Sequence, residues 1–293
     1  MRKFEEIRIE NTNICPLNCI TCPREKMSRV KGRMSYAAFV DICNFISGYI
    51  ASPNVRYFDV HGYGEPVIDN EIIKKIRYVK NTFPKVRTRM VSSLYVATFK
   101  FLEDLIDSGL DELIISCYGA SESDYQLIHG RTNYMNVRHN IEHIVKKNKE
   151  FGSTLMIIFE NLDFSHVLSS DQESSRKKIL NNWQKSLDCY GVVVRNIVPP
   201  HNWGSAYQYR NVSPSVCSIV SGFRSRVLQV TWNGDVIPCC FDYNADVVFG
   251  NLFENDLESI FNSSKYREFI LCHKKNKLEC FPPCRLCNRC LIP

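Results

Sequence analysis

The sequence predicts an α/β fold: a parallel sheet wound into a partial (β/α)6 barrel, followed by a smaller α+β region rich in cysteine. Three observations lead to this prediction. Short apolar segments alternate with amphipathic ones over the first two thirds of the chain, which is typical of parallel strands joined by helices. This alternation stops after Pro199-Pro200. The 293-residue chain also contains 14 cysteines, and most of them gather near its two ends.

Six strands are expected in the first part. They are rich in Ile, Val, Phe and Tyr, and several are continuous apolar runs, as strands buried on both faces are. They are Glu5–Glu10, Val55–His61, Val86–Ser92, Glu112–Cys117, Thr154–Glu160 and Val192–Val198. The helices expected between them have apolar residues at helical spacing. These are Tyr36–Ile50, Asn70–Phe83, Thr98–Ser108, Met135–Glu150 and Gln172–Cys189. Right-handed crossovers would wind such units into a barrel whose chemistry lies after the carboxyl ends of its strands.

A domain boundary is expected near residue 200, which divides the chain into residues 1–200 and residues 201–293. The dipeptide Asn233-Gly234 favours a type I′ hairpin turn between two short strands. The elements expected around and after it are the strands Val227–Thr231 and Val236–Pro238 and the helix Asp256–Phe269. A polar, cysteine-rich tail follows.

The composition excludes several classes of protein. Hydrophobic residues make up 44% of the chain and charged residues 23%, which are globular values and not those of disordered or fibrous chains. No apolar run is long enough for a membrane span, and the first residues lack the apolar region of a signal peptide. A net charge of +6 with scattered Lys and Arg is not a nucleic-acid-binding pattern. We therefore expect a cytoplasmic protein, whose many cysteines are not a disulfide framework.

The cysteines nearest the start, Cys15, Cys19 and Cys22, form a CxxxCxxC run directly after the first strand. Three thiolates can hold three corners of a [4Fe–4S] cluster and leave one iron open to a substrate or cofactor. The alternative is a structural zinc site, which needs a fourth Cys or His close by. The nearest histidine is the distant His61, so the spacing favours the cluster. Cys43, in the apolar stripe of a helix, is expected in the core.

This motif and its position resemble those of the radical SAM enzymes, whose CxxxCxxC loop follows the first strand of a partial (β/α)6 barrel of TIM type. The resemblance implies that Cys15, Cys19 and Cys22 bind a [4Fe–4S] cluster whose open iron chelates S-adenosylmethionine. It also implies that one electron cleaves this cofactor to a 5′-deoxyadenosyl radical, which abstracts a substrate hydrogen. Thr21 departs from the family pattern, in which an aromatic residue often precedes the third cysteine, and this weakens one expected adenine contact.

A second motif, Gly62-Tyr63-Gly64-Glu65-Pro66, is similar to the GGEP-type loop of the family. Glycines let the backbone approach the cofactor closely, and Glu65 can accept a hydrogen bond from its ammonium group. Ser116 matches the position of a ribose-contacting serine, and Arg131 resembles the arginine that reaches the methionine carboxylate. Ordinary surface positions would explain Ser116 and Arg131 equally well. The expected cofactor-binding residues are Gly62, Gly64, Glu65, Ser116 and Arg131.

The later cysteines resemble the SPASM/Twitch extension of the same superfamily, in which four thiolates from three segments enclose an auxiliary cluster. The matching residues are Cys217, Cys239 after Gly234, Cys284 and Cys287. Because Cys290 alone follows the CxxC pair, we expect one auxiliary [4Fe–4S] cluster, the Twitch arrangement, and two clusters in all. Cys280 or Cys290 could replace one of the four ligands. A zinc ribbon would use two CxxC pairs, and one is clear here.

Small Twitch enzymes of this layout are similar to those that oxidise sugar-like alcohols. Many small-molecule members also share the Asn-Trp-Gly step found in His201-Asn202-Trp203-Gly204. We therefore expect an oxidoreductase that acts on a sugar or cyclitol and uses the auxiliary cluster as electron acceptor. Its expected partners are a small-molecule substrate and a flavodoxin- or ferredoxin-type electron donor, with neither nucleic acid nor membrane.

Two alternatives remain open at this point. One is a radical SAM epimerase or peptide-modifying maturase, in which Cys117 or Cys240 would return a hydrogen atom. The short stretch before Cys15 makes a leader-peptide recognition domain unexpected. The other alternative is a non-catalytic zinc-binding protein. No catalytic residue is assigned; Arg195 and His201 are candidates for the base that an oxidation needs.

Overall fold

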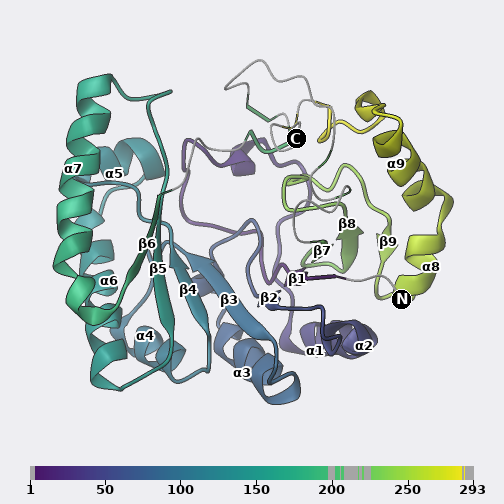
Figure 1. The fold of residues 1–293 in the computed structure, drawn as a ribbon, viewed down its shortest axis with the longest axis horizontal. Helices are drawn as coiled ribbons and strands as arrows, with labels where there is room; N and C mark the ends of the chain where they lie inside the picture. The colour runs from purple at the N-terminus through teal and green to yellow at the C-terminus, as the bar shows by residue number, and fades with distance from the viewer. Residues whose placement is uncertain are drawn as a thin grey trace.

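The computed structural model describes residues 4–196, 202–204, 206–207, 217, 220, 226–285 and 287. Within these residues one open sheet runs in the order β6-β5-β4-β3-β2-β1-β7-β8-β9. Helices α1 and α3 to α7 cover the outer side of the sheet, and its inner face turns towards the centre of the molecule (Figure 1). The predicted α/β fold with a parallel partial barrel is confirmed.

All six strands predicted for the barrel are present. They are β1 (Glu6–Ile9), β2 (Tyr57–Asp59), β3 (Arg87–Ser92), β4 (Glu112–Ile115), β5 (Met156–Asn161) and β6 (Val193–Asn196). Each pairs in parallel with the next. The end of the last predicted strand, residues 197–198, lies outside the described residues. Parallel order brings the carboxyl ends of these strands to one edge of the sheet, where the candidate site is built.

The later part of the chain continues the same sheet. β7 (Val227–Val230) lies beside β1 in parallel, with Glu6 opposite Val227. β8 (Asp235–Ile237) returns antiparallel to β7, and β9 (Gly250–Asn251) pairs with β8. The predicted hairpin is therefore confirmed, and it extends the barrel sheet on the β1 side. The boundary near residue 200 stays a prediction.

The helices correct the prediction in three places. The described helices are α1 (Tyr36–Phe45), α2 (Ser47–Ile50), α3 (Ile72–Thr82), α4 (Phe99–Ile106), α5 (Glu122–His129), α6 (Tyr134–Glu150), α7 (Ser170–Ser186), α8 (Leu257–Asn262) and α9 (Ser264–Lys274). The single helix predicted over 36–50 breaks at Ile46, which leaves the helical conformation. The helix predicted over 256–269 breaks at Ser263, whose hydroxyl caps α9. α5 was not predicted.

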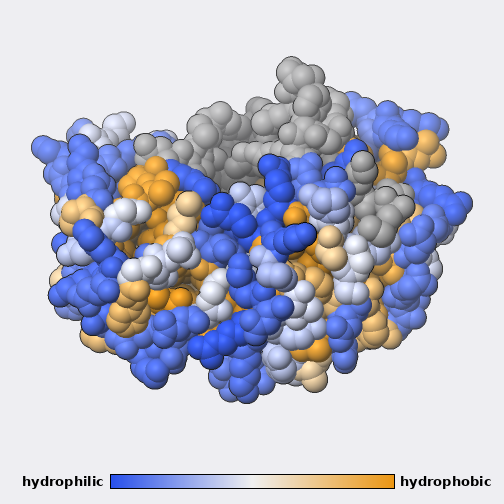
Figure 2. All heavy atoms as spheres, turned by 60° about the horizontal axis from the view of Figure 1, so that its bottom comes forward, coloured by the Kyte–Doolittle hydropathy of each residue, from blue (hydrophilic) through white to orange (hydrophobic). Residues whose placement is uncertain are grey.

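The core lies between the sheet and the helices around it. Ile7 and Ile9 of β1 are fully buried, as are Phe39, Ile42 and Cys43 of α1. The predicted core position of Cys43 is confirmed. Apolar and hydrophilic residues are interleaved on the surface that Figure 2 turns forward. No helix in the described part of the chain is long and apolar enough to cross a membrane.

Candidate functional site

The loop that carries Cys15, Cys19 and Cys22 is tightly folded. The backbone N–H of Leu17 donates to Cys15 Sγ at 3.5 Å, and Cys22 accepts from the backbone N–H of Arg24. Burial raises the pKa of all three thiols, that of Cys15 to about 12. Their deprotonation in this buried loop therefore needs a compensating positive charge, which a bound metal supplies.

The end of α5 holds this loop in place. Asn18 N–H donates to the His129 carbonyl at 3.0 Å, and Ile20 N–H donates to the Ile128 carbonyl at 2.9 Å. The two segments approach so closely at Gly130 that an added Cβ would lie 2.8 Å from the Asn18 carbonyl oxygen. Gly130 also has a φ of 68°, which glycine adopts most easily. The unpredicted helix α5 is therefore part of the site.

The Gly62–Pro66 loop lies directly against the segment that leads to Cys15. Gly64 N–H donates to the Thr12 carbonyl at 3.0 Å, and Glu65 N–H donates to the Ile14 carbonyl at 2.9 Å. A Cβ added at Gly64 would lie 2.5 Å from the Ile14 carbonyl oxygen. Gly64 is thus required by the chain's own backbone. At Gly62 an added Cβ would lie 2.3 Å from Glu10 Cγ.

Glu65 is buried beneath this loop. Its carboxylate accepts from the hydroxyls of Ser92 and Ser93, both at 2.5 Å, and from Ser93 N–H at 2.9 Å. Burial raises the pKa of Glu65, and these hydrogen bonds oppose the rise. The carboxylate also contributes to the raised pKa of Cys15, so it lies near the cysteine loop. Neither serine lies in a recognisable sequence motif, although Ser92 ends a predicted strand.

Ser116 and Arg131 border the same region. Ser116 follows β4, its N–H donates to the Ser92 carbonyl at 2.9 Å, and its side chain hydrogen-bonds Tyr118. Arg131 Nε donates to the Pro16 carbonyl at 2.9 Å. The structure therefore brings Arg131 to the cysteine loop and Ser116 to the end of β3, while their roles towards a cofactor stay predictions.

His129 was not identified from the sequence, yet it contacts a predicted ligand. Its Nδ1 lies 3.2 Å from Cys19 Sγ, and its Nε2 accepts from the Tyr118 backbone N–H at 3.1 Å. The ring is 1% exposed and stacks on Tyr125, with 4.3 Å between the ring centroids. Burial lowers the pKa of His129 to about 3.

The later cysteines form a second group. Burial raises the pKa of Cys239 strongly, and the thiols of Cys240, Cys284, Cys287 and Cys217 raise it further. The four predicted auxiliary ligands therefore lie within electrostatic reach of one another, with Cys240 beside them. Phe241 N–H donates to Cys239 Sγ at 3.5 Å, which repeats the pattern of Cys15.

Cys280 and Cys290 were predicted as possible replacements for one ligand of the auxiliary cluster, and the structure describes only the first of them. Cys280 is exposed, and its side chain hydrogen-bonds that of Cys272 in α9. Cys290 and the candidate base His201 lie outside the described residues.

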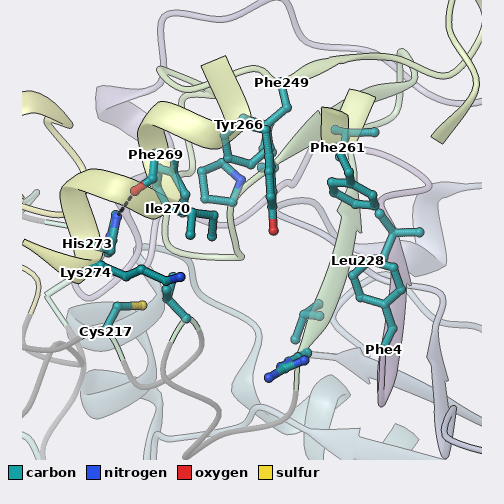
Figure 3. A pocket seen from close by; sticks show the side chains of 16 residues that line it. Phe4, Cys217, Leu228, Phe249, Phe261, Tyr266, Phe269, Ile270, His273 and Lys274 are labelled. Carbon is teal, nitrogen blue, oxygen red and sulfur yellow. Dashed lines mark hydrogen bonds between the residues drawn. The ribbon is translucent and has the colours of Figure 1, made fainter. Parts of the chain in front are cut away.

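Cys217 lines a cavity of about 470 Å³ between the β7–β8 hairpin and the last two helices. Figure 3 shows aromatic side chains along much of its wall, and His273 hydrogen-bonded to the Phe269 carbonyl.

Trp203 and Tyr63 connect the two groups of cysteines. Trp203 Nε1 donates to the Thr21 carbonyl in the CxxxCxxC run, and its ring packs edge-on against Phe241 beside Cys240. Tyr63, from the Gly62–Pro66 loop, lies 6.0 Å from the Trp203 ring, centroid to centroid. Burial raises the pKa of Tyr63, and Cys240, Asp242 and Cys239 add to the rise. The late cysteines thus lie near the predicted cofactor loop.

Charged side chains pair with one another across neighbouring strands of the sheet. Asp59 accepts from Arg8 Nε at 3.0 Å and from Arg89 Nε at 2.6 Å. These two ion pairs outweigh burial and hold the Asp59 pKa well below its usual range. Nearer the carboxyl ends, burial lowers the pKa of His61 to about 3 and raises that of Glu160. His61 Nδ1 is buried without a hydrogen-bond partner.

The residues present fit iron–sulfur clusters. Thiolates are the usual ligands of such clusters, and hydrogen bonds to their sulfur atoms tune them. Here Cys15, Cys19, Cys22 and Cys239 each accept a hydrogen bond at sulfur. In the part of the chain that is described, no three His, Cys, Asp or Glu side chains converge on a single-ion site.

Comparisons with known proteins agree with this geometry. The iron–sulfur cluster-binding domain family SPASM matches residues 222–290. The chain is 19% identical over 286 residues to the S-adenosyl-L-methionine-dependent 2-deoxy-scyllo-inosamine dehydrogenase of Niallia circulans, covering 97% of this chain and 93% of that protein. It is 28% identical over 135 residues to an uncharacterised protein of Methanocaldococcus jannaschii, covering 46% and 41%.

Solved structures share the fold. BtrN in complex with AdoMet and 2-DOIA has a TM-score of 0.64 and 19% identity, with 98% of this chain and 94% of that chain covered. Native anSMEcpe with bound AdoMet has a TM-score of 0.63 and 15% identity, with 97% and 89% covered. SuiB of Streptococcus suis bound to S-adenosylmethionine has a TM-score of 0.59 and 14% identity, with 92% and 68% covered. The CxxxCxxC loop, the partial barrel and the SPASM match over residues 222–290 support the resemblance of this chain to the SPASM/Twitch subgroup of the radical SAM enzymes.

Proposed function

We propose that this radical SAM enzyme dehydrogenates a secondary alcohol of a polar, polyhydroxylated small molecule of the sugar or cyclitol class. The observation that carries the proposal is the set of charged side chains paired across neighbouring barrel strands, with Arg8 within electrostatic reach of Cys240. The Niallia circulans relative is named as the dehydrogenase of a cyclitol, and BtrN was solved in complex with 2-DOIA. These matches support the proposed substrate class.

The carboxyl ends of β2, β5 and β6 suit a substrate with many hydroxyl groups. Glu160 and Arg195 are directly opposite in the β5–β6 register, with Arg195 Nη1 4.0 Å from Glu160 Oε1. Arg89 contributes to the electrostatics of both Glu160 and His61, so all these side chains share one face. Hydroxyl groups need donors and acceptors when they leave water, and this face supplies both.

Oxidation of a secondary alcohol to a ketone removes one hydrogen atom, one proton and one electron. When bound, S-adenosylmethionine and the two clusters would supply the radical that takes the hydrogen atom and the acceptor that takes the electron. The protein must hold the alcohol, accept its proton and keep the electron acceptor near. Cys240 lies close enough to the inner face to help raise the pKa of Arg8, although burial opposes that rise.

We assign to Glu160 the role of the base that accepts the proton of the substrate hydroxyl. Burial raises its pKa, which makes it a stronger base than an exposed carboxylate. Arg195 lies beside it and would orient the carboxylate towards the substrate hydroxyl. This assignment replaces Arg195 as the base candidate. His61 would hydrogen-bond a substrate hydroxyl through its unpartnered Nδ1.

The test is turnover of a panel of aminocyclitols and hexoses, including 2-deoxy-scyllo-inosamine, with reduced enzyme in heavy water. We expect a ketone product without solvent deuterium on carbon and one 5′-deoxyadenosine per ketone. Glu160→Gln should lower ketone formation at least tenfold while cofactor cleavage continues, and Glu150→Gln, at an exposed ion pair, should behave as wild type. Oxidation by Glu160→Gln at the wild-type rate would remove Glu160 as the base.

One observation keeps a second function open. Cys240 lies near Arg8 and Tyr63, where its thiol could return a hydrogen atom to a substrate radical. A product of unchanged mass in ordinary water, inverted and carrying one deuterium in heavy water, would identify an epimerase. Cys240→Ala should then abolish turnover while 5′-deoxyadenosine still forms. Cys117 is less suited to this role, because it is 1% exposed and burial raises its pKa to about 12.

The need for single electrons and for reduced cysteines leads us to propose an electron donor and a compartment. A flavodoxin- or ferredoxin-type protein is the donor we propose, because it delivers single electrons at low potential. The cytoplasm is the proposed compartment, since its reducing thiol pool keeps cysteines free to bind clusters. Electron transfer from either donor in a reconstituted assay of cofactor cleavage would test the first of these proposals.

A further inference from the structure

The hydrogen bonds to the three N-terminal cysteines are of two kinds. Cys15 and Cys22 accept from the backbone N–H two residues further along, Leu17 and Arg24. Such bonds follow from the local turn and cannot be altered by changing a side chain. Cys19 accepts instead from a side chain 110 residues away in the sequence, that of His129.

The tautomer of His129 is fixed by its two neighbours. Nε2 lies 3.1 Å from the Tyr118 backbone nitrogen, which can only donate. Nε2 must therefore carry a lone pair, and the ring proton is on Nδ1. Nδ1 lies 3.2 Å from Cys19 Sγ, so the histidine donates and the sulfur accepts.

The ring has little freedom to leave this position. It is 1% exposed and stacks on the rings of Tyr118 and Tyr125, whose centroids are 5.4 and 4.3 Å away. Tyr118 is itself held, because its carbonyl accepts from Arg176 Nη1 at 2.7 Å. Arg176 is 1% exposed and pairs with the buried Glu173 at 2.7 Å. The two tyrosine rings, and the buried Arg176–Glu173 pair behind Tyr118, thus hold His129 Nδ1–H towards Cys19 Sγ.

We propose that His129 is a positioning residue of the N-terminal cluster, whose Nδ1–H donates to the Cys19 thiolate and raises the reduction potential of the cluster. A cluster that gains an electron places more negative charge on its ligand sulfur atoms. A hydrogen bond to one of them is therefore stronger in the reduced state and favours reduction. The consequence is easier electron uptake from a protein donor.

Two substitutions separate the two bonds of the ring. In His129→Asn the side-chain amide can occupy the place of Nδ1 and still donate to Cys19, while the acceptor for Tyr118 is lost. In His129→Gln the side-chain oxygen can reach the place of Nε2 and accept from Tyr118, while the donor to Cys19 is lost. A purely structural role would make both variants alike.

The experiment is a redox titration of anaerobically reconstituted protein, in which the N-terminal cluster is recognised by the change of its paramagnetic spectrum on addition of S-adenosylmethionine. We expect His129→Gln to lower the equilibrium constant for one-electron reduction about tenfold, which is 59 mV. His129→Asn should stay within threefold of wild type. Equal potentials for wild type and His129→Gln, or equal shifts in both variants, would overturn the proposal.

A second measurement does not depend on cluster loading. In the cluster-free wild-type chain labelled with ¹⁵N-histidine, nuclear magnetic resonance should show His129 protonated on Nδ1 and unprotonated on Nε2. The reverse tautomer would overturn the proposal even if a variant fails to take up iron. The inference rests on the cluster assignment and not on the proposed substrate, so failure of the dehydrogenase assay leaves it standing.

Discussion

At the scale of single residues, the site depends on buried polar groups whose partners come from distant parts of the chain. Glu65 is held by Ser92 and Ser93, and Cys19 is held by His129. Glu65 and Cys19 belong to motifs that can be recognised in the sequence. Their partners are not, because a serine at a strand end or a histidine in a short helix has no spacing that marks it.

The residue-scale prediction concerns Glu65. Glu65→Gln removes the negative charge near Cys15 and should weaken S-adenosylmethionine binding by about 10- to 100-fold, as expected for one charge-assisted hydrogen bond. The measurement is the dissociation constant of S-adenosylmethionine from the reconstituted protein, with the exposed Glu150→Gln variant as the control. The cluster absorption spectrum should not change. An unaltered dissociation constant would mean that Gly62–Pro66 is only a turn packed on the cysteine loop.

At the scale of elements, the sequence predicted the strands better than the helices. The barrel strands are apolar runs, and Ile7, Ile9 and their neighbours are buried where that pattern places them. α5 was missed because few of its positions are apolar, yet two of them, Tyr125 and Ile128, are fully buried. Local propensity also cannot show that a serine at 263 will end one helix and cap the next.

Three barrel strands are tied together by one carboxylate, that of Asp59. Asp59→Asn leaves the arginines of β1 and β3 facing each other without their shared partner. We expect a loss of about 3 kcal/mol and a fall of roughly 5–10 °C in the melting temperature of the protein. Asp104→Asn, which breaks an exposed pair with Lys100, should shift it by less than about 2 °C.

The pH dependence of this loss has a defined sign. The folded-state pKa of Asp59 is depressed, so its stabilising effect is present above the unfolded value of about 3.9 and lost as pH falls through the lower folded value. The difference in melting temperature between wild type and Asp59→Asn should therefore be constant from pH 8 to pH 5. A difference that disappears between pH 7 and pH 5 would contradict the assignment.

At the scale of the whole molecule, one sheet connects both cysteine groups. β1 leads to the first group and β7, at its side, leads through the hairpin to Cys239. The sequence indicated a boundary near residue 200 and gave no sign of the β1–β7 pairing, because more than 200 residues separate Glu6 from Val227 and no local pattern records which distant strand is the neighbour. That pairing places the late cysteines beside the predicted cofactor loop.

The central claim is that the chain holds two clusters, one at each cysteine group, and the iron and labile sulfide content of anaerobically reconstituted protein tests it most directly. Wild type should contain about eight irons and eight sulfides, from two cubanes. Replacing Cys15, Cys19 and Cys22 together by Ala should leave about four of each and abolish cleavage of S-adenosylmethionine, while Cys43→Ala keeps the full content. Stoichiometric zinc in a protein without sulfide would contradict the account and identify a zinc-binding protein.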